Sequence, residues 1–458
     1  MSRSMKKTEA DTMAELKQTN TIVHPRYGCA IGAAYTVAAI PGGVPIANCG
    51  PGCVDKQYFA MSGSNGFQGS GVAAGGDMPS VNFGENEVVF GGAKKLDGLI
   101  KSALKIVKGD LFVVLTGCSG ELIGDNVESV VKEYRRQGYN IVFADTAGFK
   151  GNNLRGHEIV VRSVIDQFVG DFKGRRRKTL INLWAEVPYF NTFWRGDTAE
   201  LKRILEGAGF EVNVLFGPQS GGINEWKRIP RAAFNLVVSP WVGVNIAKHL
   251  EQKYGQPYLH IPVLPIGEEA TSAFLRQVVE FAGIDPQKAE RFIAREAHEY
   301  YYYLEHFADF FAEYWFGLPS KFATVGDSAY NIALTKFLAD QVGLLPVKQI
   351  ITDNPPEKQR DRIAELYHSL TDGVEADPVF LEDGYLIEQS LRETDFGSGV
   401  PLILGSSWEK DVAAERKGLL LEVGTPATEE VVINRSYIGY RGALTLLEKI
   451  YTATVGGK

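Results

Sequence analysis

The sequence predicts an α/β fold made of three successive doubly wound, Rossmann-like parallel-sheet domains. Short apolar segments, often β-branched, alternate with amphipathic stretches of helical period, and most are bounded by Gly, Pro, Asp or Ser. These strands are too many for one flavodoxin-like domain and too irregular for a barrel of eight equal units. The predicted strands are residues 111–115, 141–144, 179–183, 211–216, 235–238, 259–263, 322–325, 347–351, 402–404 and 419–423. The clearest helices are residues 126–137, 198–208 and 331–342.

Breaks in this pattern divide the chain. We expect an N-terminal extension over residues 1–23, a first domain over 24–170, a second over 171–286 and a third over 287–458. The third domain should begin with a long connecting helix within the aromatic-rich segment 289–318. Because this segment contains a run of tyrosines and two consecutive phenylalanines, we expect it to be largely buried between domains.

Composition narrows the function. The chain has 458 residues, 45% of them hydrophobic and 22% charged, as in globular proteins, and its net charge of -7 predicts no nucleic-acid partner. The basic run 173–178 is best interpreted as a solvated loop, with a docking patch for an acidic partner as the alternative. No apolar run is long enough to span a membrane and the N-terminus does not resemble a secretory signal, so a cytoplasmic location is expected.

All four cysteines, Cys29, Cys49, Cys53 and Cys118, lie near the start of the chain. Disulfides are rare in large intracellular chains, so this crowding points to ligands or a reactive site. Cys118 directly follows a predicted strand, and all four lie close to glycines, which allow backbone amides to approach a cluster closely. Thiolates select zinc or iron–sulfur clusters.

Three interpretations compete with a cluster. Zinc usually needs paired cysteines on two knuckles, and Cys49 with Cys53 supplies only one. A second alternative is that the cysteines are buried and have no chemical role. A catalytic thiol is disfavoured because no His or Asn accompanies these loops in a recognisable motif. The wide spacing of Cys29, Cys53 and Cys118 fits a cluster best.

In this region the chain resembles the nitrogenase component-1 superfamily. The family pattern is a Cys, a Gly-Cys, an acidic segment ending in Val-Phe-Gly-Gly, and a stretch similar to Thr-Cys-x-x-Glu-x-Ile-Gly-Asp-Asp. The chain has Cys29, Gly52-Cys53, residues 84–92 and residues 116–127 in that order, with Gly117 as one additional residue. Residues 262–275 and 434–444 are similar to segments of the β-type chain, so the resemblance covers about residues 24–458.

The resemblance implies a role in electron transfer. Cys29, Cys53 and Cys118 match the β-chain ligands of an iron–sulfur cluster shared with an α-type subunit, either an 8Fe-7S P-cluster or a 4Fe-4S cluster. Cys49 has no family counterpart. The implied assembly is an α2β2 heterotetramer that receives electrons from a transient, ATP-hydrolysing iron protein.

No catalytic residue is expected in this chain. Cofactor-carrying α-chains use a mid-chain Cys and a late His, whereas here no Cys follows Cys118 and no His follows His368. The reduction site is therefore expected in the partner. The chain also lacks the G-x-x-x-x-G-K-[ST] loop, so ATP hydrolysis is expected elsewhere.

Three departures from nitrogenase β-chains favour a nitrogenase-like reductase over dinitrogen reduction. Residues after Cys29 and before Cys53 differ from the family pattern, and Asn152 stands where the family has a redox-sensitive serine. Methylthio-alkane reductase, which reduces carbon–sulfur bonds, is the best named candidate. The alternatives are a nitrogenase β-chain of an alternative-metal type and a non-catalytic scaffold for cofactor assembly.

Weaker signals complete the expectations. The turns 326–328 and 405–407 each follow a strand and could bind an anion, but interior turns are favoured. Glu121 and Asp125 are expected to cap the succeeding helix. His24 is the only histidine beside the cysteine region.

Overall fold

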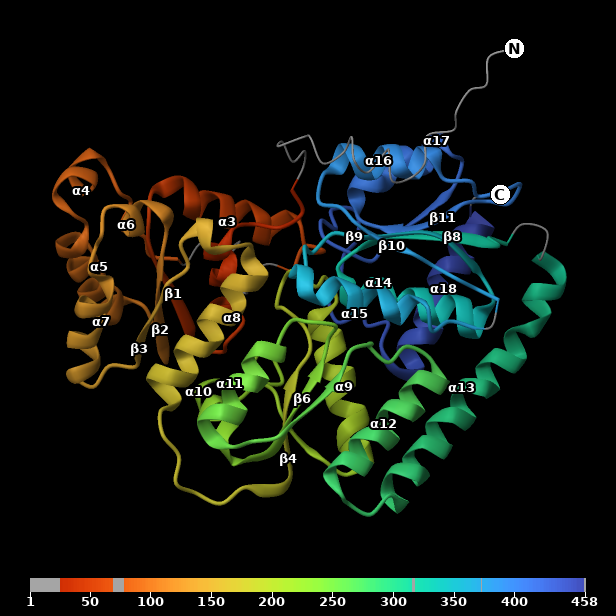
Figure 1. Cartoon of the computed structure of the whole chain (residues 1–458), viewed down its shortest axis with the longest axis horizontal. Coiled ribbons are helices and arrows are strands. Elements are labelled where there is room, and N and C mark those ends of the chain that lie inside the picture. Colours follow the sequence, from red (N-terminus) through yellow and green to blue (C-terminus); the bar gives the residue numbers. More distant parts are fainter. Residues whose placement is uncertain (1–24, 69–77, 315–317, 372, 457–458) are drawn as a thin grey trace, which may run out of the picture.

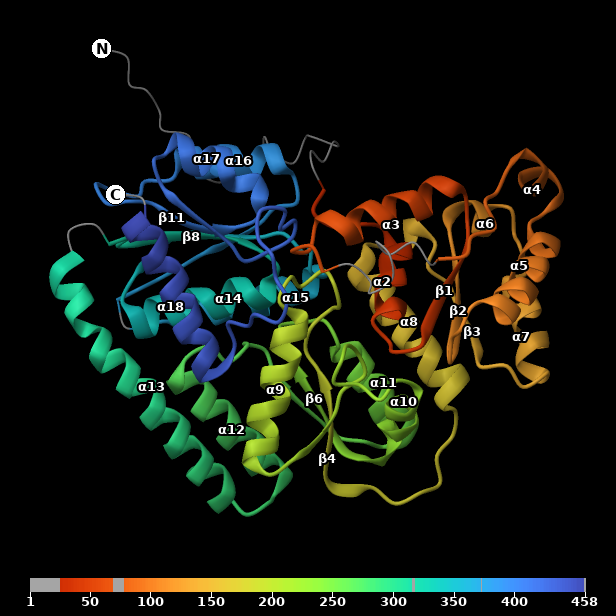
Figure 2. The same ribbon diagram turned by 180° about the vertical axis from the view of Figure 1, so that it is seen from behind.

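The structure, a computed structural model, describes residues 25–68, 78–314, 318–371 and 373–456, and it contains three separate parallel sheets. Figure 1 shows them in three lobes that follow one another along the chain, and Figure 2 shows the same arrangement from behind. The predicted α/β class with three parallel sheets is confirmed. The predicted extension 1–23 and His24 lie outside the described residues.

The first sheet has the strand order β1-β2-β3, with β1 at Gly43–Asn48, β2 at Leu111–Thr116 and β3 at Ile141–Ala144. Every residue of β2 is buried, because helices cover both faces of the sheet. One face packs against α5 and α7 and the other against α2 and α8. The helices of this lobe are α2 (Ala34–Ala38), α3 (Pro51–Gly63), α4 (Glu85–Phe90), α5 (Ala93–Ile106), α6 (Cys118–Leu122), α7 (Val127–Arg136) and α8 (Asn153–Val164), with short helical turns η1 (Ala30–Ala33), η3 (Gly148–Lys150) and η4 (Ile165–Val169).

The second sheet has the order β5-β4-β6-β7, from β4 (Arg177–Trp184), β5 (Glu211–Asn213), β6 (Ala232–Val238) and β7 (Tyr258–Ile261). Its helices are α9 (Trp194–Ala208), α10 (Ile223–Arg228), α11 (Val244–Tyr254) and α12 (Glu268–Ala282), with the turn η5 (Ile229–Arg231).

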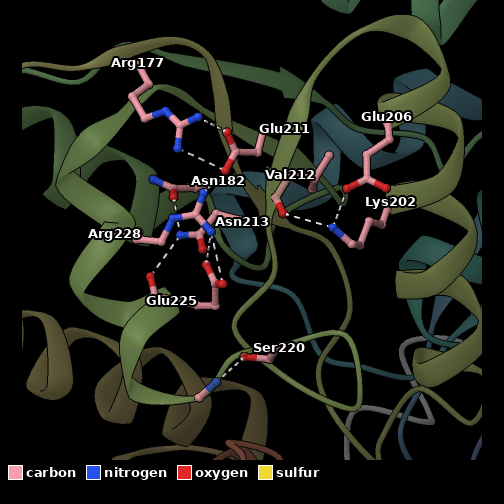
Figure 3. A network of polar contacts seen from close by, with 11 residues as sticks. Arg177, Asn182, Lys202, Glu206, Glu211, Val212, Asn213, Ser220, Glu225 and Arg228 are labelled. Carbon is pink, nitrogen blue, oxygen red and sulfur yellow. Dashed lines mark hydrogen bonds and ion pairs between the residues drawn. The ribbon is translucent and has the colours of Figure 1, made fainter.

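Buried amides join the strands of this second sheet. The side chain of Asn213 donates to Asn182 (2.8 Å), which donates to Asn235 (2.9 Å). At the exposed edge, Arg177 and Arg228 both bind the carboxylate of Glu211 (Figure 3). The basic run 173–178 is exposed, as the solvated-loop interpretation expected, but its last two residues already belong to β4, and two of its arginines bind within this lobe.

The third sheet has the order β10-β9-β8-β11-β12, from β8 (Lys321–Gly326), β9 (Leu345–Ile351), β10 (Pro378–Phe380), β11 (Leu402–Gly405) and β12 (Leu419–Glu422). Its helices are α14 (Ser328–Lys336), α15 (Glu357–Tyr367), α16 (Gly384–Glu393), α17 (Lys410–Glu415) and the C-terminal α18 (Gly439–Gly456), with the turns η7 (Phe337–Val342) and η8 (Ser407–Glu409). The sequence pattern does not predict β1 and β10, and both strands contain a proline.

The predicted long helix exists as α13 (Gln287–Tyr314), but the expectation that it is largely buried is wrong. Tyr300 is buried, whereas Tyr301, Tyr302 and Tyr303 are each more than half exposed. Consecutive helical residues point about 100° apart, so three aromatic side chains in a row cannot share one packed face. The helix contacts α9, α12 and α18 on one side and forms an outer edge of the molecule (Figure 1).

None of the helices in the described part of the chain is long and apolar enough to cross a membrane.

Candidate metal centre

The four cysteines lie at one edge of the first sheet. Cys49 directly follows β1, and Cys118 begins α6 just after β2. Because β1 and β2 are neighbours and parallel, their carboxyl ends place these two residues side by side. Cys53 lies in the first turn of α3, and Cys29 directly precedes η1.

Cys29 and Cys118 approach the same backbone atom, the α-carbon of Gly148. A Cβ built on Gly148 would lie 2.9 Å from the Cys118 sulfur and 3.1 Å from the Cys29 sulfur. The Gly148 N–H also donates a hydrogen bond to the Cys118 sulfur over 3.1 Å. Gly148 follows β3 and Cys118 follows β2, so the ends of two neighbouring strands and the loop of Cys29 build this position. The absence of a side chain at Gly148 leaves room for both sulfurs.

Cys49 and Cys53 form a second pair. The Cys49 S–H donates to the Cys53 sulfur, which raises the pKa of Cys49 far above its ordinary range, and burial adds to that rise. The same hydrogen bond lowers the pKa of Cys53 to about 6 despite partial burial, and the nearby charge of Lys56 contributes to this lowering. This hydrogen bond therefore favours the thiolate form of Cys53, which is the form that binds metals. The charge of Cys29 also acts on Cys49, so the two pairs are neighbours.

Exposure separates Cys49 from the other three cysteines. Cys49 is fully buried, whereas Cys53 and Cys118 are half-buried and Cys29 is exposed. The three cysteines that match family ligands thus reach the surface, and the cysteine without a counterpart lies beneath them.

The loop that carries Cys29 is held against the start of α8 by backbone contacts. Cys29 forms an isolated antiparallel bridge with Asn152, and the N–H of Asn153 donates to the carbonyl of Gly28 over 2.9 Å. The side chain of Asn152 caps α8 by accepting from the N–H of Arg155. Asn152, expected near the cluster from its sequence position, therefore lies next to Cys29.

The expectation that Glu121 and Asp125 cap the succeeding helix is wrong. The chain turns at Gly124, whose φ is +73°, and the residue that caps α7 is Asn126, which accepts from the N–H of Ser129. Glu121 binds the ammonium of Lys150, and Asp125 accepts from the N–H of Gly92 over 2.8 Å. Both carboxylates hold the loops around Cys118 together instead.

These donors suit a thiolate-bound inorganic cluster better than a single ion. In the described part of the chain, no three Cys, His, Asp or Glu side chains converge to hold one metal ion. Thiolate donors, a backbone N–H directed at sulfur and a glycine that keeps the space clear are features of iron–sulfur sites. A Cβ built on Gly28, Gly50 or Gly52 meets no described atom within 4 Å, so these residues border open space. The residues therefore fit part of an iron–sulfur site, and the ligand roles of Cys29, Cys53 and Cys118 stay a prediction.

The two glycine-containing turns of the third sheet bind their own helices. Asp327 accepts from the N–H groups of Ala329 and Tyr330, and Ser406 forms a reciprocal cap with Glu409. Both turns thus satisfy their helix N-termini internally, as the interior-turn interpretation expected.

The sequence did not reveal a group of buried carboxyl groups where the lobes meet. Glu186, Asp197 and Asp353 are almost completely buried, Asp327 is half-buried, and no described residue donates a hydrogen bond to either carboxylate oxygen of Glu186. Burial is the main cause that raises the pKa of Asp327 to about 7. The sequence did contain one signal for this group: Asp327, Asp353 and Glu186 each follow a strand, where side chains of parallel sheets gather.

The fold and the cysteine edge together define the class of protein. The Nitrogenase component 1 type Oxidoreductase family matches residues 29–454, so the chain belongs to this family of oxidoreductases.

Within that family the chain is similar to β chains. It is 24% identical to the nitrogenase vanadium-iron protein beta chain of Trichormus variabilis over 95% of both chains. It is 25% identical to the nitrogenase molybdenum-iron protein beta chain of Methanococcus maripaludis, over 95% of this chain and 94% of that one. It is also 25% identical to the nitrogenase molybdenum-iron protein beta chain of Frankia alni, over 93% of this chain and 81% of that one.

The fold has a solved counterpart. The structure is similar to "Nitrogenase Cp1 at pH 6.5" with a TM-score of 0.76 and 20% identity, over 96% of this chain and 94% of that chain.

Proposed function

We propose that this chain is the β-type, electron-relay subunit of a nitrogenase-like reductase. Cys29, Cys53 and Cys118 would hold one side of an iron–sulfur cluster, an 8Fe-7S P-cluster or a 4Fe-4S cluster, shared with an α-type partner. When bound, the cluster supplies one-electron transfer between an ATP-hydrolysing iron protein and the partner's active-site metallocluster.

The observation that carries this proposal is that three surface-reaching thiols lie at the carboxyl edge of the first sheet, two of them meeting at Gly148. The chain's own residues prepare these thiols as ligands. The Gly148 N–H stabilises negative charge on the Cys118 sulfur, and the Cys49 S–H and Lys56 do the same for Cys53. Cys49 acts as a hydrogen-bond donor to a ligand in this arrangement, which gives it a role without ligation.

Exposed apolar side chains on the cysteine-bearing lobe support a partner at this edge. They lie on α4, on α6 directly after Cys118, and on the turn that contains Gly148. These residues are Val88, Val89, Phe90, Leu122 and Phe149, each more than half exposed. Such apolar residues at one edge mark protein–protein contact sites. We propose that the α-type subunit covers them in an α2β2 assembly and that it contains the reduction site, because this chain has no Cys after Cys118 and no His after His368.

Methylthio-alkane reductase remains the best candidate for the particular activity. Asn152 lies beside Cys29 with its side chain committed to capping α8 and to the carbonyl of Asp353. A neutral amide cannot become an oxyanion ligand, unlike the serine of nitrogenase β-chains. The alternative of a β-chain from an alternative-metal nitrogenase is supported by the similarity to the vanadium-iron chain. A non-catalytic scaffold for cofactor assembly would use the same thiols.

Single cysteine variants test the ligand assignment. In the anaerobically purified complex, Cys53→Ala and Cys118→Ala should each lose most of the iron and weaken subunit association, because one cluster would join both chains. Cys49→Ala removes a hydrogen-bond donor to Cys53 rather than a ligand, so it should cost much less iron than the other two variants. Iron quantitation, low-temperature electron paramagnetic resonance and size-exclusion chromatography are the measurements. A Cys118→Ala complex with full iron content and a normal signal would show that the assignment is wrong.

Substrate assays separate the three candidate functions. With the iron protein, ATP and a reductant, a methylthio-alkane reductase should form an alkane and a thiol from a thioether. A nitrogenase β-chain should instead support ammonia formation. A scaffold should contain iron and reduce neither substrate.

A further inference from the structure

The sulfurs of Cys49 and Cys53 lie in contact, with the Cys49 S–H donating to the Cys53 sulfur. Three residues separate the two cysteines in the sequence, and the N–H of Cys53 donates to the carbonyl of Gly50 over 3.3 Å, which closes a turn between them. Both side chains pack in the same apolar core. A disulfide needs Cβ atoms about 3.5–4.5 Å apart, so two sulfurs that already touch need only a small adjustment to form one.

The two cysteines differ in their access to solvent. Cys49 is completely buried, whereas Cys53 is half-buried and lies in the first turn of α3. The positive charge of Lys56 acts on Cys53 and also attracts an anionic reagent to it. An external oxidant therefore reaches Cys53 first, and Cys49 lies behind it as the second thiol. Redox-sensing cysteines are accessible thiols that often have such a resolving cysteine beside them.

The segment between the cysteines has room to close the ring. Cys49 is fixed, because it packs where Gly117 has no side chain: a Cβ built on Gly117 would lie 2.4 Å from the Cβ of Cys49. By contrast, a Cβ built on Gly50 or Gly52 meets no described atom within 4 Å. Two glycines in open space allow the backbone to move Cys53 toward the fixed Cys49.

From this arrangement we infer that Cys49 and Cys53 form a reversible disulfide when the chain lacks a cluster and meets a low-molecular-weight disulfide such as glutathione disulfide. The Cys53 thiolate attacks one sulfur of the oxidant, an S–S bond forms between Cys53 and one glutathione, and the other glutathione leaves as its thiolate. The Cys49 sulfur then attacks the Cys53 sulfur, the second glutathione leaves, and the Cys49 proton passes to a departing glutathione thiolate. Two protein thiols are thereby oxidised to one disulfide, and the oxidant is reduced to two molecules of glutathione.

The disulfide does not depend on the proposed function, but its consequence for the cluster rests on it. Oxidation removes the thiolate of Cys53, one of the three proposed ligands, and ligands must be thiolates to bind metal. The oxidised chain should therefore not accept its cluster until a thiol reductant restores the pair. The two cysteines would thus control when the chain can be loaded with iron.

Thiol mapping on the full chain tests the disulfide. The chain is freed of metal with a chelator, reduced, and incubated anaerobically with glutathione disulfide before the remaining thiols are blocked with N-ethylmaleimide. Cleavage after Tyr35 and Lys56 yields residues 36–56, which contain Cys49 and Cys53 and no other cysteine. Mass spectrometry should find this peptide unlabelled and lighter by two hydrogens than its reduced form. Dithiothreitol should restore both thiols.

Three variants assign the roles of the cysteines. Cys49→Ser should stop at the mixed disulfide and keep one glutathione on Cys53, because the resolving thiol is missing. Cys53→Ser should slow the modification of Cys49 at least about tenfold, because access governs thiol exchange. Cys29→Ser removes the exposed cysteine of the other pair and should form the disulfide as the unmodified chain does. If Cys49→Ser does not fold, Cys53→Ser, which changes a half-buried residue, still tests the order of attack.

The inference is overturned if residues 36–56 keep two free thiols, if a disulfide joins Cys29 to Cys118 instead, or if the folded Cys49→Ser variant retains no glutathione. Iron and sulfide are then offered to the reduced and the oxidised chain in parallel, and the oxidised chain should bind less than about half as much iron. Equal iron in both forms would overturn the control of loading. If neither form binds iron, the proposed function is contradicted while the disulfide stands.

Discussion

Gly148 shows how a single residue can control two distant side chains. The sulfurs of Cys29 and Cys118 both approach its α-carbon, although these cysteines are far apart in the sequence. The sequence indicated that the cysteines gather, because strand ends of a parallel sheet meet at one edge. It could not indicate that Gly148 lies between two of the sulfurs, because that depends on how the Cys29 loop is pinned against Asn152.

Gly148→Ala should therefore reduce the iron content of the complex. The new methyl group would lie 2.9 Å from the Cys118 sulfur and 3.1 Å from the Cys29 sulfur, closer than carbon and sulfur normally approach. Gly98→Ala on α5, where a Cβ meets nothing within 4 Å, is the matched control and should keep its iron. Iron per chain and the thermal unfolding midpoint are measured for both. Equal iron content in the two variants would contradict the prediction.

At the scale of elements, the sequence predicted apolar strands best. It predicted least well the features that depend on packing between elements, such as which face of a helix is buried. The alternating pattern found β2, β3 and most strands of the other sheets, but the prolines in β1 and β10 concealed two strands. The strand predicted over 211–216 ends at Asn213. The exposed half of α13 could not be predicted, because aromatic content indicates burial in general and does not say which neighbours exist.

Helix α13 is held by a buried carboxylate, and this allows a sharp test. Glu296 is 2% exposed and binds Arg203 of α9 over 2.7 Å, with Arg295 at 3.0 Å and Arg441 of α18 more distant. Burial acts to raise the pKa of Glu296, but the hydrogen bonds from Arg203 and Arg295 outweigh it and leave this pKa below its ordinary value.

Glu296→Ala should lower the free energy of unfolding by about 1–3 kcal/mol, because it removes a buried acceptor of charged hydrogen bonds, although Arg203 keeps its pair with Glu200. Glu299→Ala, one turn further on the same helix and 45% exposed, should cost less than about 1 kcal/mol. Urea denaturation of both variants is the measurement. Equal losses of unfolding free energy would contradict the role of Glu296 in holding α13 against α9.

At the scale of the whole molecule, the carboxyl ends of strands from two sheets place acids at the junction of the lobes. The sequence indicated three sheets, but it did not show how the lobes pack, so the burial of Glu186, Asp197 and Asp353 could not be predicted. The domain boundaries at residues 170 and 286 themselves stay a prediction.

Asp327 should make stability fall as pH rises. Burial first, and the charge of Asp353 second, raise its pKa to about 7 in the folded chain, against about 4 in an unfolded chain. Between these values the unfolded chain loses a proton that the folded chain keeps. The contribution of Asp327 is therefore fully present below about pH 4 and is lost as pH approaches 7, at up to about 1.4 kcal/mol per pH unit.

Asp327→Asn keeps an oxygen for the helix cap but cannot ionise, so its stability should decline less between pH 4 and 7 than that of the unmodified chain. The free energy of unfolding at several pH values is the measurement, with the exposed Asp361→Asn as control. Parallel curves for Asp327→Asn and the unmodified chain would show that Asp327 does not retain its proton.

The short segment before Cys29 connects two lobes over very few residues. Arg26 is anchored in the third lobe by its ion pair with Glu409, and Gly28 and Cys29 are anchored in the first by Asn153 and Asn152. Because so few residues separate these two anchors, a rotation of one lobe against the other would displace the sulfur of Cys29. Any rotation between these two lobes and the position of the Cys29 thiol are thus mechanically coupled.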